Sequence, residues 1–249
     1  MNRPLAVITT ASSGMGLELS KVFAENGYDL IIGEWGDEIF EAKNHLESLG
    51  TKVHAVQVNL ASYKGVEHFH REILADGRPV DAVVINAAGA LRGAFLETEL
   101  DDEIKLINLN CVSTTHLTKR LLNKMADQRH GRLLLTSSMM VDDSSLGAVF
   151  RASKSFILSL GEALREEVKE YGISVTVLMP ETHDAGLEFG QFDPREFAQE
   201  GFDAMMEGKA LVTPGSLANK VLDLANRFLP ENWKNFAQRF ISESSSPEH

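Results

Sequence analysis

Short apolar runs alternate with longer stretches of helical period along most of the chain, and this alternation constrains the fold more than any other feature. The runs fall at residues 5–9, 29–33, 53–58, 82–86, 131–136, 174–178 and 211–213, and the predicted helices at residues 16–26, 37–49, 64–76, 100–127, 149–171, 194–207 and 216–228. Several runs are almost unbroken in apolar residues, as is typical of strands covered on both faces. Strands that alternate with helices form parallel sheets with crossover connections. The sequence therefore predicts an α/β fold with a doubly wound, Rossmann-type parallel sheet.

The length of the chain and the absence of an internal repeat favour a single domain. Its 249 residues, 43% of them hydrophobic, can bury one sizeable core. We expect this domain to span residues 1–241, with residues 181–208 forming a loop and small helices that cover the substrate. Residues 242–249 are polar and serine-rich, so we expect them to form a disordered tail.

The charge and cysteine content of the chain exclude several classes of function. Acidic residues (36) outnumber basic ones (24), and the net charge of −12 repels phosphate backbones and anionic lipid surfaces. The single cysteine, Cys111, can form neither an internal disulfide nor a thiolate cluster for a metal. No segment reads as a signal peptide or a membrane span. We therefore expect a cytoplasmic protein with a small-molecule substrate, no nucleic acid or membrane partner and no metal site.

A glycine-containing turn follows the first predicted strand and leads into the first predicted helix. Residues 9–16 read Thr-Thr-Ala-Ser-Ser-Gly-Met-Gly. Glycines in such a turn let backbone N–H groups approach a pyrophosphate, which then lies at the positive end of the helix. The pattern predicts a dinucleotide cradle formed by Thr10, Ser12, Ser13, Gly14, Met15 and Gly16.

An acidic residue, Glu34, stands at the end of the second predicted strand, about twenty positions after the glycine turn. A carboxylate there can accept hydrogen bonds from the adenosine ribose hydroxyls, and it repels a 2′-phosphate. No arginine or lysine occupies the cradle or the neighbouring positions. We therefore expect NAD(H) rather than NADP(H) as the cofactor. The other interpretation, an ordinary surface glutamate, stays open because the register of the loop is inferred.

These motifs and several that follow resemble the short-chain dehydrogenase/reductase family over nearly the whole chain. The turn resembles the family's T-G-x-x-x-G-x-G, with Thr10 in place of the first glycine. Asn59 stands where the family has its adenine-contacting aspartate. Residues 86–89, Asn-Ala-Ala-Gly, resemble the N-N-A-G strand end, with Ala87 in place of the second asparagine. The resemblance implies cofactor contacts at Asn59, Asn86, Ala88 and Gly89.

The resemblance also implies catalytic positions. Asn108 best matches the family's asparagine that helps hold a proton-relay water, and Asn110 is the alternative. Ser138 matches the substrate-orienting serine, and Ser137 is the alternative. Lys154 matches the lysine that hydrogen bonds to the nicotinamide ribose, whereas the plainer interpretation is a solvated helix charge.

The family's Y-x-x-x-K motif appears here as Phe150-Arg151-Ala152-Ser153-Lys154, so a phenylalanine stands in place of the catalytic tyrosine. Residues four apart share a helix face. In the family that spacing lets the lysine ammonium lower the pKa of the phenol, which can then exchange a proton near neutrality. Phe150 has no such proton. Loss of a general acid typically costs about 10² to 10⁴ in rate, so reduced activity is physically possible.

Two hypotheses follow from the missing tyrosine. In the first, the protein is a diverged oxidoreductase that transfers hydride between NAD(H) and a small organic substrate. That substrate is an imine or iminium whose charge suits the Phe150 ring, or a carbonyl activated in another way. A loop residue could then supply the acid: His183, or Asp142 or Asp143, all of which also read as ordinary loop residues. In the second hypothesis, the protein is a nucleotide-binding sensor or an inactive scaffold. We favour the first.

The family usually pairs the helices that correspond to residues 100–127 and 149–171 across a dimer axis. The resemblance therefore implies a homodimer or homotetramer.

Overall fold

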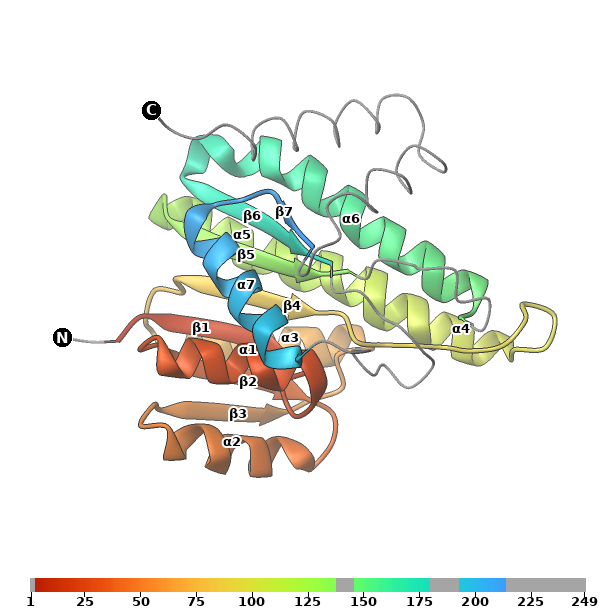
Figure 1. The fold of residues 1–249 in the computed structure, drawn as a ribbon, viewed down its shortest axis with the longest axis horizontal. Coiled ribbons are helices and arrows are strands. Elements are labelled where there is room, and N and C mark those ends of the chain that lie inside the picture. The colour runs from red at the N-terminus through yellow and green to blue at the C-terminus, as the bar shows by residue number, and fades with distance from the viewer. Residues whose placement is uncertain (1–2, 138–145, 180–192, 214–249) are drawn as a thin grey trace.

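A computed structural model describes residues 3–137, 146–179 and 193–213, and the predicted alternation of strands and helices is confirmed in them. The strands are β1 (Leu5–Thr9), β2 (Asp29–Glu34), β3 (Val53–Gln57), β4 (Ala82–Asn86), β5 (Gly131–Thr136), β6 (Ile173–Leu178) and β7 (Leu211–Val212). The helices are α1 (Gly14–Glu25), α2 (Glu38–Ser48), α3 (Tyr63–Ala75), α4 (Leu100–Ile107), α5 (Thr114–Gln128), α6 (Ala148–Val168) and α7 (Pro194–Glu207). The strands form one parallel, seven-stranded sheet in the order β3-β2-β1-β4-β5-β6-β7 (Figure 1). The doubly wound Rossmann-type fold is therefore confirmed.

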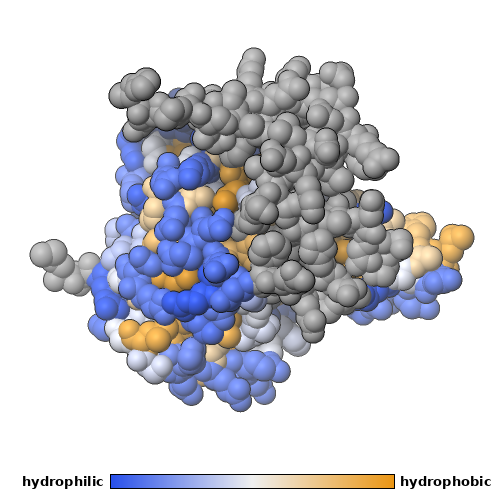
Figure 2. Space-filling model, viewed as in Figure 1, coloured by the Kyte–Doolittle hydropathy of each residue, from blue (hydrophilic) through white to orange (hydrophobic). Residues whose placement is uncertain are grey.

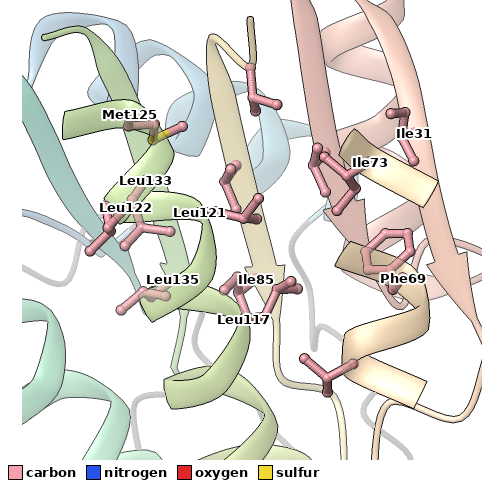
Figure 3. Packing of buried hydrophobic residues seen from close by; sticks show 14 of the residues in the cluster. Ile31, Phe69, Ile73, Ile85, Leu117, Leu121, Leu122, Met125, Leu133 and Leu135 are labelled. Atoms are coloured by element: carbon pink, nitrogen blue, oxygen red, sulfur yellow. The ribbon is translucent and has the colours of Figure 1, made fainter. Parts of the chain in front are cut away.

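Each face of the sheet carries its own layer of helices and its own apolar core. On one face, Phe69 of α3 and Leu121 of α5 pack against the strands (Figure 3), and Ile157 of α6 belongs to the same cluster. On the other, Phe23 of α1 and Phe197 of α7 are fully buried. Strands enclosed in this way must be apolar toward both layers, which explains the unbroken apolar runs in the sequence. Within the described residues, no helix is both long and apolar enough to cross a bilayer.

The strand order places a topological switch between β1 and β4. From β1 the chain proceeds outward through β2 to β3, and it then crosses back to β4 on the opposite side of β1. In open α/β sheets, ligands bind in the crevice beyond the carboxyl ends of the strands at such a point. The turn after β1 and the segment after β4, where the sequence predicts cofactor contacts, both begin at this crevice.

The helix predicted over residues 100–127 is continuous but not uniform. Between α4 and α5 lies a π-helical turn, η1 (Asn108–Ser113). Wide turns of this kind are rare and are frequently found at functional sites. The sequence predicts one helix over these residues and gives no sign of the turn, because a single π-helical turn widens the helix locally without ending it. The predicted helix over residues 216–228 and the tail at residues 242–249 lie outside the described residues.

Only the second half of the segment expected to cover the substrate, residues 181–208, lies within the described residues. Residues 181–192 lie outside the described part of the chain, whereas α7 packs beside α1 on the sheet. Phe197, Phe202 and Met205 of α7 are buried in the core of that face. The apolar stripe of residues 194–207 is thus packed within the fold, and the role of residues 181–208 in covering a substrate stays a prediction.

Candidate nucleotide and catalytic site

The turn between β1 and α1 leaves the amino end of α1 available to an anion. Ser13 precedes the helix with an extended backbone and makes no capping hydrogen bond with its side chain. Gly14 opens the helix with φ of +51°, a conformation that favours glycine, and no atom of the described residues lies within 4 Å of where its Cβ would be. The first N–H groups of a helix have no partner within it and can bind a phosphate. The geometry therefore fits a pyrophosphate cradle.

Gly16 allows the helix to approach the strand end closely. A Cβ added at this buried glycine would lie 1.8 Å from the Thr10 carbonyl oxygen and 2.8 Å from the Asn86 Nδ2 atom. The same two neighbours are joined by a hydrogen bond, in which Asn86 Nδ2 donates to the Thr10 oxygen over 3.2 Å. Only a residue without a side chain fits here, as close packing of strand and helix in a dinucleotide site requires.

Glu34 lies at the end of β2, beside the cradle. Its Oε2 atom accepts a hydrogen bond from Ser12 Oγ at 3.2 Å and lies 3.5 Å from the Ser12 backbone nitrogen. The carboxylate is thus directed toward the turn rather than free on the surface. Trp35 follows it with 67% of its surface exposed.

Asn59 stabilises its own loop. Its Oδ1 atom accepts a hydrogen bond from the Ala61 N–H at 2.9 Å, and its carbonyl accepts one from Ser62 Oγ at 3.0 Å. Ser62 in turn caps α3. These contacts shape the start of α3, and a role of Asn59 in contacting adenine stays a prediction.

Asn86 joins three strand ends at the switch point. Its backbone N–H donates to Thr9 Oγ1 at 3.0 Å, and its Oδ1 atom accepts from Thr136 Oγ1 at 2.7 Å. With the bond to Thr10, the buried Asn86 connects β1, β4 and β5. Ala88 and Gly89 follow it, half-buried, at the start of the segment beyond β4.

The structure distinguishes between the two asparagines of η1. Asn110 is fully buried, and its Oδ1 and Nδ2 atoms bond to the backbone N–H and carbonyl of Gly89 at 3.1 and 3.0 Å. Its Nδ2 atom also donates to Ser153 Oγ at 3.0 Å. Asn108 is only half-buried, at the start of the turn. The geometry therefore favours Asn110, the alternative, as the asparagine that positions the segment after β4.

Lys154 and Phe150 share the buried face of α6. The Lys154 side chain is only 6% exposed, so the interpretation of a solvated helix charge is wrong. Its Nζ atom donates a hydrogen bond to the Ala87 carbonyl oxygen and lies 5.4 Å from the centre of the Phe150 ring. Burial of the ammonium lowers the pKa of Lys154 to about 8. A cation is thus held at the carboxyl end of β4, next to the cradle.

Comparison with known proteins shows what this arrangement belongs to. Residues 4–192 match the family model described as short chain dehydrogenase. The chain belongs to the short-chain dehydrogenase family. Oxidoreductase UcpA of Salmonella typhimurium is 31% identical over 179 residues, which cover 70% of this chain and 67% of that protein. The resemblance stated from the motifs is therefore confirmed, and the protein is an NAD(P)-dependent oxidoreductase of this family.

Solved structures of family members share the fold. A short-chain dehydrogenase/reductase from Burkholderia phymatum in complex with NAD has a TM-score of 0.83 at 18% identity and covers 91% of this chain and 94% of its own. A short-chain dehydrogenase from Sphingobium yanoikuyae in complex with NADPH has a TM-score of 0.76 at 21% identity. The match covers 90% of this chain and 94% of that one.

Thr10 departs from the family's turn pattern, and its backbone conformation is strained. It stands in place of the first glycine and has φ of 51°. A β-branched residue in the left-handed region is a strained outlier, at roughly 1–2 kcal/mol. Two hydrogen bonds to its backbone hold it there, one from its N–H to the Gly33 carbonyl at 2.8 Å and one from the Asn86 side chain to its own carbonyl.

The predicted substrate-orienting serine of the family lies outside the described residues, and only its alternative can be placed. Ser137 is buried, and its hydroxyl donates to the Lys154 carbonyl oxygen at 2.9 Å. That hydroxyl therefore joins β5 to α6, which leaves Ser138 as the better candidate for substrate contact. Asp142, Asp143 and His183 also lie outside the described residues, and their roles stay predictions.

Proposed function

We propose that the protein transfers hydride between NAD(H) and a small organic carbonyl compound. The observation that carries the choice of cofactor is the position of Glu34, whose carboxylate is bonded to Ser12 at the edge of the cradle. A carboxylate at this position favours free ribose hydroxyls and repels a 2′-phosphate. When bound, the nicotinamide supplies or accepts the hydride, and the residues of the chain bind it, orient the substrate and handle the proton.

The contact between Lys154 and Phe150 supports a carbonyl rather than an iminium substrate. The face of the Phe150 ring that we expected to attract a substrate cation already faces the Lys154 ammonium. A second positive charge nearby would be repelled, because like charges interact strongly in a partly desolvated site. An oxygen that gains negative charge as hydride arrives would instead be stabilised.

We expect the purified protein to bind NADH at least about tenfold more tightly than NADPH, a difference of about 1.4 kcal/mol. Nucleotide fluorescence titrations measure both affinities. Glu34→Gln should remove most of the preference, because it removes the negative charge that repels a 2′-phosphate. Glu41→Gln, which changes an exposed glutamate of α2, should keep it. Equal affinities in the unchanged protein would contradict the assignment of NADH. If neither nucleotide binds at millimolar concentration, only the scaffold hypothesis is left.

The substrate class is tested by comparing a ketone with an imine. With saturating NADH, we expect cyclohexanone to be reduced faster than 2-methyl-1-pyrroline. Faster reduction of the imine would show that the substrate brings its own charge and would overturn the carbonyl assignment.

A second copy of the chain is proposed to pack on α5 and α6, as the family resemblance implies. A groove of about 460 Å³ runs between these helices, lined by residues that include Leu122, Leu160 and Leu164. Further apolar surface is exposed along the same side on α4 and α6, and Figure 2 shows apolar residues gathered at the edge beside α4. Burial of such a stripe is the usual driving force for a stable dimer.

This packing predicts that a charge on α6 dissociates the protein. Phe156 of α6 is 38% exposed, and Phe40 of α2, on the opposite face of the sheet, is 46% exposed. Phe156→Glu should lower the mass measured by light scattering to that of the monomer, whereas Phe40→Glu should leave the dimer or tetramer intact. A monomer in the unchanged protein would contradict the proposal.

A further inference from the structure

Lys154 carries exchangeable protons beside Phe150, the residue that stands in place of the family's tyrosine. It follows Phe150 by one turn of α6, and its ammonium lies over the Phe150 ring. The turn of α6 that carries both residues is joined to η1, since Ser153 Oγ donates to the Phe150 carbonyl at 2.7 Å and accepts from Asn110. The position of the ammonium is thus set by the same elements that build the cofactor site.

We propose that Lys154 gives the proton that completes carbonyl reduction. The proposal rests on the proposed function, because it concerns the same site and reaction. Hydride from the reduced nicotinamide dinucleotide adds to the carbonyl carbon, and the C=O π pair moves to the oxygen. An N–H bond of Lys154 breaks as the O–H bond forms, which leaves a neutral amine, and a proton from solvent restores the ammonium. Oxidation of the alcohol runs these steps in reverse.

The other protic groups near Phe150 or Lys154 among the described residues are less suited to this task. The Ser153 hydroxyl donates to the Phe150 carbonyl oxygen. Cys111 of η1 is half-buried, and burial raises the pKa of its thiol, which therefore stays neutral and a weak acid. In contrast, Lys154 holds its ammonium with one backbone acceptor, the Ala87 carbonyl.

Burial gives Lys154 an acid strength that matches the task. Its pKa is lowered to about 8, and a general acid works best when its pKa is near the working pH. In the described part of the chain, Cys111 is the titratable group whose charge acts on Lys154, and a thiolate there would raise the lysine pKa. Reduction needs the ammonium, so its rate should fall as the pH rises through about 8, and alcohol oxidation should rise over the same interval.

The first test observes the amine without any reaction. In nucleotide-free protein labelled with 13C-lysine, NMR follows the Cε signals with pH, and the signal lost in Lys154→Arg is assigned to Lys154. We expect it to titrate near 8, apart from the other lysines. Titration together with them near the ordinary value of about 10.4 would overturn the proposal.

The second test is chemical rescue at saturating NADH. Lys154→Ala should lower kcat for cyclohexanone by about 10² to 10⁴. Methylamine, ethanolamine and trifluoroethylamine should restore part of it, with rates that follow the amine pKa. Lys124→Ala, which changes an exposed lysine of α5, should keep the full rate without response to amines. A merely structural role would give rescue that is absent or independent of amine pKa.

The outcomes separate this proposal from the proposed function. If the unchanged protein reduces cyclohexanone and Lys154→Ala retains its kcat, or loses it without amine-dependent rescue, the oxidoreductase function stands and the acid role of Lys154 is overturned. If the unchanged protein binds NADH but reduces neither the ketone nor the imine, the proposed function is overturned and the acid role with it.

Discussion

Replacement of Gly16 by alanine is expected to lower the free energy of unfolding by about 3 kcal/mol and to abolish measurable nucleotide binding. The added methyl group would lie 1.8 Å from the Thr10 carbonyl oxygen, which is a backbone atom and cannot rotate away. Relief requires that α1 move from β1 or that the turn give up the bond between Asn86 and Thr10. Either movement displaces the N–H groups that would bind the pyrophosphate.

Urea denaturation and the NADH titration measure the two effects of Gly16→Ala. Gly50→Ala is a matched control, because Gly50 has φ of +83° but, in the part of the chain that the structure describes, has nothing within 4 Å of the added Cβ. It should cost only about 1–2 kcal/mol through its backbone conformation and leave NADH binding unchanged. Wild-type stability and affinity in Gly16→Ala would show that the turn is looser than the structure describes.

The fold could be predicted because its main determinant is a local pattern repeated along the chain. Each strand enclosed by two helical layers needs an apolar run, and each crossover needs a helical stripe, so residues 29–33 or 82–86 reveal their element without reference to the rest. The cradle could be predicted for the same reason. Its turn is built from consecutive residues, and Gly16 can be recognised from its place between a strand and a helix.

The catalytic part of the site could be predicted only in outline, because it depends on which side chains the fold turns inward. The motif around Lys154 favours a ribose ligand over a surface lysine, and the burial of Lys154 against Phe150 excludes the surface lysine, while the ribose contact stays a prediction. The backbone strain at Thr10 could not be predicted, because the sequence shows only that a threonine replaces a glycine and does not give its φ angle. Ser137 and Ser138 are neighbours in sequence, and only the bond from Ser137 to α6 separates them.

Asn110→Ala should be far more destabilising than Asn108→Ala, although the two residues lie two positions apart. The fully buried Asn110 side chain makes three hydrogen bonds, to the Gly89 N–H, the Gly89 carbonyl and Ser153 Oγ. Its loss leaves buried polar groups without partners, at about 1–3 kcal/mol for each such group, so we expect a total near 3 kcal/mol. Asn108 is half-buried, and its replacement should cost no more than about 0.5 kcal/mol.

The same pair of variants tests why η1 is a π-helical turn. The bonds to Gly89 draw Asn110 inward from the helical run, and a wider turn accommodates that displacement without ending the helix. Without these bonds, the segment after β4 loses its anchor, and NADH affinity should fall in Asn110→Ala but not in Asn108→Ala. Comparison of the urea midpoints and NADH affinities of the two variants checks this directly. A larger loss of stability and NADH affinity in Asn108→Ala than in Asn110→Ala would contradict this expectation. It would assign the role of the family's asparagine to Asn108.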